Sequence, residues 1–562
     1  MNHRLFIVLF TSLIIISTTV GAQSLPSEII TPDEKLTYKT VGEVNLSLHV
    51  LKNGFLDDKN LPNVVFIYAD DLGRGLLSSE GQKIIKTPNI DQLSQMGVRF
   101  ENAYGSMFCA PARASLLTGY HDCQKDKWKI ARGGAYIKLS KDSTLENTTI
   151  QQALDEQYGS IPETEVFLAE VFQQAGYKTG QFGKLDWGFS TTHNQLKRHG
   201  WDEYYGYYDH VRCHGFYPPF LFENGQQVNI AGNTRADCGK TQENDENGGY
   251  EDRWNTKGKK QYAQNLMLEK ILAFIRKHQK ERFFLYHPTQ LPHGPSVIPT
   301  IHKDFIYNPN LTEIEKTYAS MVKMLDDHVG IIVEELKQLG LFEQTIIIFS
   351  SDNGHELYYP SKGKLVKSNK ENILGEKIDN INTKYYSNTA VDVFDGNDGM
   401  AGIKRSNWEG GVRVPLIYYW KGHIEGGRTV NQLVTNYDMM ATYADLFDIA
   451  LPKEKHSQTY LPELLGHENP MKRTHTVYAS FMGPALVTND GWKLRYYKPK
   501  DIFQLYYLPD DYREENNLIE QDHDKFLALK DLLLKACNGD LDNGYFNTSA
   551  RILPRITFDN ER

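Results

Sequence analysis

The sequence has few cysteines, no excess of basic residues and only one long apolar run. Its 562 residues include five cysteines, far below the density of a small disulfide-stabilised protein. Aspartate and glutamate (71) outnumber lysine and arginine (62), and the net charge of -9 argues against nucleic acid as a partner. With 40% hydrophobic and 24% charged residues, the chain has the composition of a globular protein with two to three structural units.

The apolar run lies at the N-terminus. Leu5 to Ile16 follows the positive residues His3 and Arg4, and small residues at 20–22 form a cleavage site. This pattern predicts a signal peptide over residues 1–22, and therefore an exported protein, periplasmic or secreted, with no membrane span after cleavage. A membrane-anchoring helix is the alternative, but the run is shorter than the roughly 20 apolar residues that a span needs.

An odd number of cysteines in an exported chain suggests that one thiol has a separate task. If that thiol is Cys109, the other four form an even set: Cys123, Cys213, Cys238 and Cys537. Either one or two disulfides or four reduced thiols fit this set, and the sequence does not choose among the pairings.

Strand-like and helix-like segments alternate through most of the chain. Continuous apolar runs such as Asn63 to Tyr68 are typical of strands that are buried on both faces. Further strands are expected at 177–182, 283–286, 345–349 and 416–420, and helices at 87–93, 165–175, 262–277 and 312–339. The alternation predicts an α/β fold with a large, mostly parallel sheet covered by helices on both sides.

The segments before and after this region differ in pattern. Period-two alternation within 36–52 predicts a β-hairpin extension over residues 23–60. The main domain then covers 61–450, and 433–442 within it is expected to be helical. Residues 451–562 contain closely spaced short strands, which predict a smaller α+β unit with an antiparallel sheet, and a helix at 522–537.

The run Cys109-Ala110-Pro111-Ala112-Arg113, followed by Leu-Thr-Gly at 117–119, resembles the sulfatase signature C-x-P-x-R with its L-T-G. The alternative is a buried structural cysteine with proline and arginine at a chance spacing. The resemblance covers about 63–518 and implies an alkaline-phosphatase-like α/β/α fold. It also implies that a formylglycine-generating enzyme or an anaerobic sulfatase-maturing enzyme oxidises Cys109 to formylglycine (3-oxoalanine), the nucleophile.

Oxygen-bearing side chains follow two of the expected strands. Asp70 and Asp71 come after the first, and Asp352 and Asn353 after the strand at 345–349. Because ligands of open α/β sheets bind at the carboxyl ends of strands, these groups suit a hard cation. Calcium is favoured over zinc because no thiolate or imidazole set accompanies them, although Asp-Asp after a strand is also common as a cap or turn. The resemblance implies one Ca²⁺ held by these four residues and by residue 109.

Four cationic or titratable residues lie in motifs that resemble elements of the same family. Arg113 belongs to the signature, Lys184 resembles the Gly-Lys-Trp element, His293 the Pro-His-x-Pro loop and Lys404 the K-x-x-x-x-E-G-G element. The resemblance implies that Arg113 helps to acidify the nucleophile and that Lys184, His293 and Lys404 hold the sulfuryl oxygens. His293 or Lys404 would protonate the leaving oxygen. Individually, each is also plausible as an ordinary surface lysine or loop histidine.

The sequence departs from the family after Lys184, where many members have Trp and then His. Asp186 occupies the histidine position, so the base for sulfate elimination is open between Asp186 and His355, with a supporting role for His355 as the alternative. Arg405, His214 and Tyr217 resemble substrate-binding residues of a subset of bacterial polysaccharide sulfatases. Aromatic residues around Tyr217 are suited to stacking on a sugar, or equally to packing a loop over the core.

Together these features predict a type I sulfatase that acts on a sulfated carbohydrate. An algal polysaccharide such as ulvan, carrageenan or an agar-type glycan, or a glycosaminoglycan fragment, is the expected substrate and partner. Two other hypotheses are a phosphate or phosphonate monoester hydrolase of the same superfamily and a non-catalytic binder of sulfated glycan.

Overall fold

The computed structural model describes residues 61–124, 133–136, 146–158, 164–185, 190–234, 257–359, 370–371, 377–379, 384–386 and 392–546. The predicted signal peptide (1–22), the hairpin extension (23–60), Asp186 and Cys238 lie outside the described residues. Residues 58–562 form one compact unit, which contains all the elements below.

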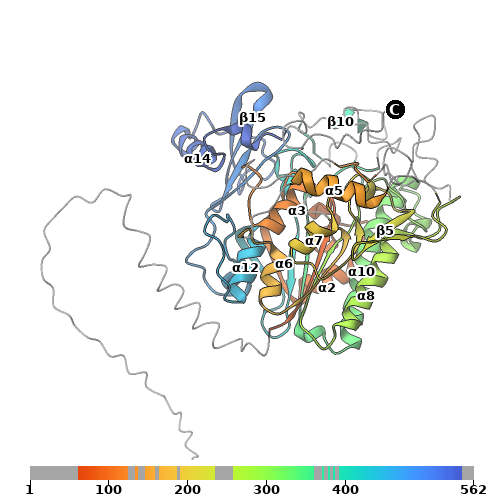
Figure 1. Cartoon of the computed structure of the whole chain (residues 1–562). Helices are drawn as coiled ribbons and strands as arrows, with labels where there is room; N and C mark the ends of the chain where they lie inside the picture. The colour runs from red at the N-terminus through yellow and green to blue at the C-terminus, as the bar shows by residue number, and fades with distance from the viewer. Residues whose placement is uncertain are drawn as a thin grey trace, which may run out of the picture. The chain divides into compact units, whose positions relative to one another are not determined.

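The main element is a ten-stranded, mostly parallel sheet (Figure 1). The strand order is β12 (Arg428–Thr435), β2 (Val98–Tyr104), β11 (Leu416–Tyr419), β8 (Thr345–Ser351), β1 (Asn63–Ala69), β7 (Phe283–Pro288), β3 (Lys178–Lys184), β4 (Glu203–Tyr207), β5 (Phe220–Glu223) and β6 (Gln226–Asn229). β1 pairs in parallel with both β7 and β8, and β3 pairs in parallel with β7 and β4. β11 is antiparallel to β8 and β2, and β5 and β6 form an antiparallel edge.

Helices cover both faces of this sheet, as the sequence predicts. Val65 and Ile67 of β1 belong to a core that includes residues of α2 (Pro88–Met96), α8 (Ala263–Lys277) and α10 (Glu313–Gln338). On the opposite face, Phe284 of β7 stacks on Phe172 of α6 (Leu168–Gln174) with ring centroids 3.8 Å apart. Because successive strand residues point to opposite faces, each central strand is buried on both sides, which explains its continuous apolar sequence.

The C-terminal part forms a separate four-stranded antiparallel sheet in the order β13 (His475–Tyr478), β14 (Ala485–Thr488), β15 (Trp492–Tyr497) and β16 (Ile502–Tyr507). Leu529 and Leu533 of α14 (His523–Ala536) pack against leucines of this sheet in a second core. Figure 1 shows β15 and α14 together in blue. The predicted fold class, a large mostly parallel sheet with helices plus a small antiparallel sheet, is confirmed.

One sequence-based expectation is wrong. The segment 433–442, expected to be helical, is divided between the end of β12 and the start of α12 (Asp438–Leu446). Leu433 pairs with Asn102 of β2, so this apolar stretch completes the sheet instead of starting the helix. Other helices that the structure describes are α5 (Asn147–Tyr158), α7 (His193–Arg198), α9 (Lys303–Ile306), α11 (Glu409–Val412) and α13 (Leu461–Leu464).

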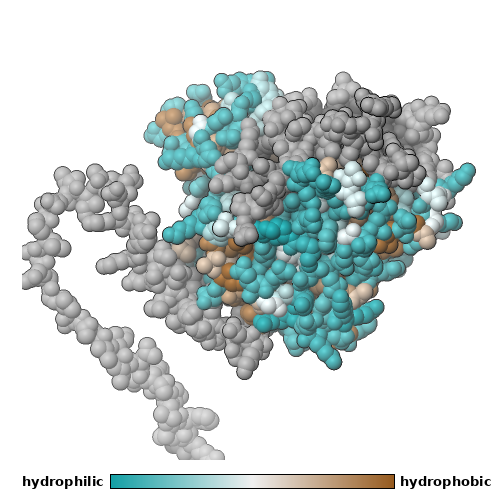
Figure 2. All heavy atoms as spheres, viewed as in Figure 1, coloured by the Kyte–Doolittle hydropathy of each residue, from teal (hydrophilic) through white to brown (hydrophobic). Residues whose placement is uncertain are grey.

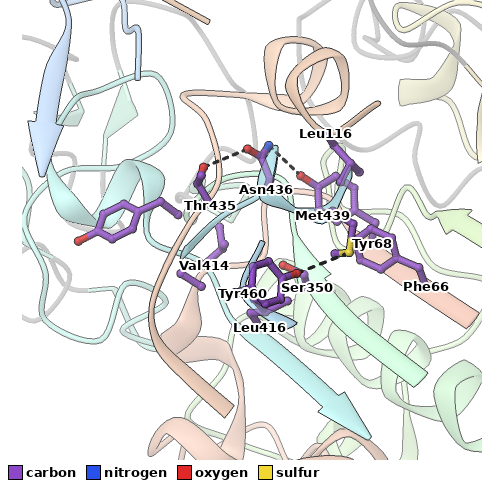
Figure 3. A pocket seen from close by; sticks show the side chains of 12 residues that line it. Phe66, Tyr68, Leu116, Ser350, Val414, Leu416, Thr435, Asn436, Met439 and Tyr460 are labelled. Carbon is purple, nitrogen blue, oxygen red and sulfur yellow. Dashed lines mark hydrogen bonds between the residues drawn. The ribbon is translucent and has the colours of Figure 1, made fainter. Parts of the chain in front are cut away.

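A small cavity lies between the sheet and α12, bordered by Tyr68, Asn436, Met439 and Tyr460 (Figure 3). Its volume of about 10 Å³ accommodates about one water molecule and no sugar. The described surface in Figure 2 is mainly hydrophilic, with smaller hydrophobic patches. None of the helices in the described part of the chain has the length and apolar character that crossing a bilayer requires.

Candidate active site

The carboxyl ends of β1 and β8 bring the predicted oxygen-bearing side chains together. The Asp71 backbone N–H donates to Asp352 Oδ1 at 3.0 Å, and Asn353 Nδ2 donates to Asp71 Oδ1 at 2.7 Å. Asp71 has a φ of +62°, a left-handed conformation that aspartate tolerates better than most residues. Asp70, Asp71, Asp352 and Asn353 are all fully buried. The parallel pairing of the two strands therefore places three carboxylates and one amide in a single buried cluster.

Cys109 lies at the start of α3 (Cys109–Thr118), directly against this cluster. Its Sγ donates to Asp70 Oδ1 at 2.9 Å and lies 3.7 Å from Asp71 Oδ1. Burial raises the pKa of the thiol, and the charge of Asp70 acts in the same direction. The unmodified side chain is therefore a protonated thiol, which is a poor nucleophile.

Arg113 is four residues after Cys109, so the helix places both side chains on the same face. Its guanidinium is fully buried, with Nη2 3.1 Å from Asp352 Oδ2 and 3.9 Å from Asp70 Oδ2. The guanidinium also lies over the Tyr68 ring, 5.4 Å from its centroid. The C-x-P-x-R spacing thus attaches a fixed positive charge to the same helix that carries the thiol.

Two lysines and a histidine approach the cluster from other segments. Lys184, the last residue of β3, forms an ion pair with Asp70. Lys404 Nζ lies 2.7 Å from Asp71 Oδ1 and 3.2 Å from Cys109 Sγ. His293 Nε2 lies 3.5 Å from Asp71 Oδ2, while its Nδ1 contacts the Gly294 carbonyl at 2.6 Å. The predicted cationic residues therefore surround the thiol and the carboxylates.

These charges determine the protonation states in the cluster. Burial alone would raise the pKa of Asp70, but Lys184, Arg113 and Lys404 together hold it well below its usual range. Burial and the neighbouring charge of Asp70 raise the pKa of Asp352 to about 8. Burial opposes the charge on Lys404, but Asp71 raises the pKa of this lysine above its ordinary value.

The cluster has the composition of a site for a hard divalent cation. Ligand atoms of Asp70, Asp71, Cys109 and His293 lie within 4.8 Å of one another. Asn353 Oδ1 is buried and has no hydrogen-bond partner among the described residues, so an oxygen ligand remains available beside the carboxylates. The expectation that no imidazole accompanies the aspartates is wrong, because His293 lies beside them. The set is still dominated by carboxylate and amide oxygens, the ligands that calcium prefers.

A glycine is required where two of the site loops meet. A Cβ atom on Gly354, next to Asn353, would lie 1.9 Å from the carbonyl oxygen of Gly410. The Asp-Asn-Gly segment and the segment carrying Lys404 can therefore approach each other only because position 354 has no side chain.

The residues expected to bind substrate lie in different surroundings. The His214 ring stacks on His293, with centroids 4.2 Å apart and an interplanar angle of 8°. Arg405 is adjacent to Lys404 in sequence and forms an ion pair with the buried Glu356. Tyr217 packs edge-on against Tyr262, 5.3 Å between centroids, at the border of the core. His214 is thus next to the cluster and Tyr217 packs at the border of the core, and the substrate-binding role of both stays a prediction.

His355 points away from the cluster. Its Nε2 contacts the Tyr359 hydroxyl at 2.8 Å and its Nδ1 faces the Tyr318 hydroxyl at 3.4 Å. The ring is fully buried, and its role, a base or a supporting residue, stays a prediction. The other candidate base, Asp186, lies outside the described residues. Cys123, Cys213 and Cys537 are buried thiols in the structure, and no disulfide joins the cysteines of the described residues.

Sequence reasoning missed Tyr358. Its hydroxyl donates to Asp71 Oδ2, and the residue is fully buried. Burial raises the pKa of this phenol, and the charge of Asp71 acts in the same direction, so the hydroxyl is a protonated donor. The only signal in the sequence is its position six residues after Asp352, and spacing within a loop does not specify where a side chain points.

Comparison with known proteins agrees with this geometry. The Sulfatase family model matches residues 62–449, more than half of the chain, and the model for the C-terminal part of N-sulphoglucosamine sulphohydrolase matches residues 402–536. An N-acetylgalactosamine-6-O-sulfatase of Bacteroides thetaiotaomicron is 27% identical over 536 residues, 84% of this chain and 92% of the relative. The N-acetylgalactosamine-6-sulfatase of Rattus norvegicus is 29% identical over 400 residues, which cover 70% of this chain and 63% of the rat protein.

Solved structures show the same fold. A protein from the metabolism of multiple glycosaminoglycans by Bacteroides thetaiotaomicron superposes with a TM-score of 0.62 at 23% identity, covering 85% of this chain and 100% of that chain. Ps i-CgsB in complex with k-i-k-neocarrahexaose gives the same TM-score and identity, covering 87% of this chain and 96% of that chain. At this identity the likeness concerns the fold.

Proposed function

This chain belongs to the sulfatase family, and from that premise we propose that it hydrolyses a sulfate ester of a sulfated sugar at residue 109. The observation that carries the proposal is the contact of Cys109 Sγ with Asp70 at 2.9 Å and with Lys404 at 3.2 Å. The family signature, the carboxylates and the cationic residues therefore meet at one atom.

Oxidation of Cys109 to formylglycine would supply a hydrated aldehyde as nucleophile, and Ca²⁺ held by residue 109 with Asp70, Asp71, Asp352 and Asn353 would polarise a sulfuryl oxygen. Arg113 holds residue 109 and Asp352 in a fixed arrangement through its ion pair. Lys184 and Lys404 carry the positive charge that stabilises the sulfuryl oxygens in the transition state.

The leaving sugar oxygen needs a proton, and we assign this role to His293 or Lys404. His293 Nε2 points at Asp71, so it faces the same space as Cys109. The imidazole of His214, stacked on His293, is suited to contact the sugar beside the reacting group. His293, Lys184 and Lys404 would thus act on a sulfate group next to the carboxylates that they contact.

The substrate class follows from the relatives. Proteins named N-acetylgalactosamine-6-sulfatase match this chain in two distant organisms, so a 6-sulfated N-acetylgalactosamine unit is the first substrate to test. Sulfated algal oligosaccharides come next. We further propose that the chain is exported, periplasmic or secreted, and that a formylglycine-generating or anaerobic sulfatase-maturing enzyme converts Cys109.

The test is release of inorganic sulfate by protein that has been co-produced with a maturing enzyme. The substrates are a panel of sulfated galactosamine, glucosamine and carrageenan fragments, and the matched control is Cys109→Ala. We expect release from at least one sugar and none from the variant, with both proteins equally folded by circular dichroism. Faster turnover of an aryl phosphate than of an aryl sulfate would favour a phosphate monoester hydrolase, and retained activity in Cys109→Ala would reject the proposal.

A further inference from the structure

We propose that Tyr358 is a positioning residue of this site, whose hydroxyl holds the carboxylate of Asp71 in the orientation that cation binding requires. The inference rests on the cation of the proposed function. It assigns a role to a residue that lies in none of the sequence motifs identified above.

Each oxygen of the Asp71 carboxylate meets its own donor. Asn353 Nδ2 donates to Oδ1 at 2.7 Å, and the Tyr358 hydroxyl donates to Oδ2. The Lys404 ammonium contacts both oxygens, at 2.7 Å and 2.8 Å. Two neutral donors on opposite oxygens define the plane of the carboxylate, whereas a single ammonium that bridges both oxygens does not. Of the two, Asn353 is itself a proposed cation ligand, so Tyr358 is the donor dedicated to orientation.

The position of the Tyr358 ring is fixed by its surroundings. The ring is fully buried and packs against His293, with centroids 4.9 Å apart and an interplanar angle of 43°. A Cβ atom on Gly294 would lie 2.0 Å from a carbon of this ring, so the glycine after His293 makes room for it. The Ser296 hydroxyl donates to the Tyr358 carbonyl at 2.9 Å, which ties the two loops together. Packing thus aims the hydroxyl at Asp71 and supports the imidazole at the same time.

The next residue provides a matched control. Tyr359 is also buried, and its hydroxyl also donates to an aspartate, Asp392 Oδ1 at 2.5 Å. That aspartate and the adjacent His355 lie outside the carboxylate cluster. Removing either hydroxyl deletes one buried hydrogen bond to a carboxylate, and Tyr359→Phe also loses the contact with His355 Nε2 at 2.8 Å. Only Tyr358→Phe alters a proposed cation ligand.

The experiment compares the wild type, Tyr358→Phe and Tyr359→Phe in the full chain. Each protein is stripped with a chelator and titrated with Ca²⁺, following the melting temperature and the binding isotherm. Loss of a partner that orients a metal ligand costs roughly 10- to 100-fold in metal affinity. We expect a loss of about tenfold or more for Tyr358→Phe and less than about twofold for Tyr359→Phe, with similar melting temperatures in the absence of Ca²⁺.

Equal Ca²⁺ affinity in Tyr358→Phe and Tyr359→Phe would overturn the inference while leaving the proposed function intact. A wild type that does not respond to Ca²⁺ would instead overturn the cation site itself, and the inference with it. Sulfate release provides a second readout: at saturating Ca²⁺ Tyr358→Phe should recover most of its kcat, because a positioning role is compensated by mass action.

Discussion

A buried cluster of charged residues connects the segment that carries Lys404 to the C-terminal sheet. The lysine of this cluster, Lys493, is the most informative position for a stability test. Lys493 of β15 lies 2.9 Å from Glu409 Oε1 and 2.7 Å from Glu514 Oε1. All three side chains are at most 1% exposed. Glu409 also accepts a hydrogen bond from the Tyr104 hydroxyl at 2.7 Å. Lys493→Met keeps the volume of the side chain but leaves two buried carboxylates without their shared cation.

Removing one partner of a buried ion pair costs about 3–5 kcal/mol, because the remaining charge is uncompensated. We expect Lys493→Met to lower the free energy of unfolding by about this amount. Because an unpaired buried carboxyl group binds a proton at higher pH than in the unfolded chain, part of the loss should return as the pH falls. The double variant Lys493→Met/Glu514→Gln, which removes one of the two unpaired charges, should recover about 1–2 kcal/mol.

The assay is urea unfolding at several pH values, with Lys525→Met as control. Lys525 forms an exposed ion pair, 3.5 Å from Asp490, and such pairs are worth about 0–1 kcal/mol. If Lys493→Met lowers the free energy of unfolding no more than Lys525→Met does, the charged cluster does not stabilise the contact between the Lys404 segment and the C-terminal sheet, and the reasoning is refuted.

Three further predictions concern the site and its frame. Lys404→Ala should lower kcat for sulfate release by about 10²- to 10³-fold, the usual cost of losing one transition-state donor, and steady-state kinetics would show it; a loss below tenfold would contradict its role. Gly354→Ala should destabilise the fold by about 3 kcal/mol because its Cβ would meet the Gly410 carbonyl at 1.9 Å, and an unchanged melting temperature would argue against the loop contact. Burial lowers the pKa of His287 to about 4 and that of His328 to about 3. The unfolded chain then binds protons that the folded chain does not, so the free energy of unfolding should fall as the pH drops from about 6.5 to 4, by about 3 kcal/mol for His287. His328→Gln should make this decline with pH shallower, and an unchanged slope would contradict the burial of His328 as a neutral group.

Much of the site could be predicted because strand ends and helix spacing are local properties. A continuous apolar run predicted β1, and the aspartates directly after it had to lie at the edge of the sheet. The four-residue spacing of Cys109 and Arg113 similarly placed both on one helix face. The apolar pattern did not separate the strand from the helix in 433–442. β12 ends at Thr435, which pairs with Tyr104, the last residue of β2, and this pairing partner is distant in the sequence.

The remaining features depend on contacts between segments far apart in the sequence. Tyr358 reaches Asp71 because the loop after β8 turns toward the residues that follow β1, and a periodic pattern in the sequence does not predict that path. The stacking of His214 on His293 likewise joins two loops that are 79 residues apart in the sequence. The partners of His355 follow from the packing of Tyr318 and Tyr359, which the sequence around His355 does not specify.

The central claim is that oxidised Cys109 is the nucleophile, and the most direct measurement relates turnover to the chemical state of this residue. Preparations with different extents of maturation are digested, and mass spectrometry of the peptide that contains residue 109 gives the fraction of thiol and of aldehyde. Sulfate release is measured on the same samples. The account predicts a rate that is proportional to the fraction of aldehyde at position 109 and is zero for the thiol form. Sulfate release by protein that carries only the thiol, or none by fully converted protein on any sulfated sugar or aryl sulfate, would contradict it.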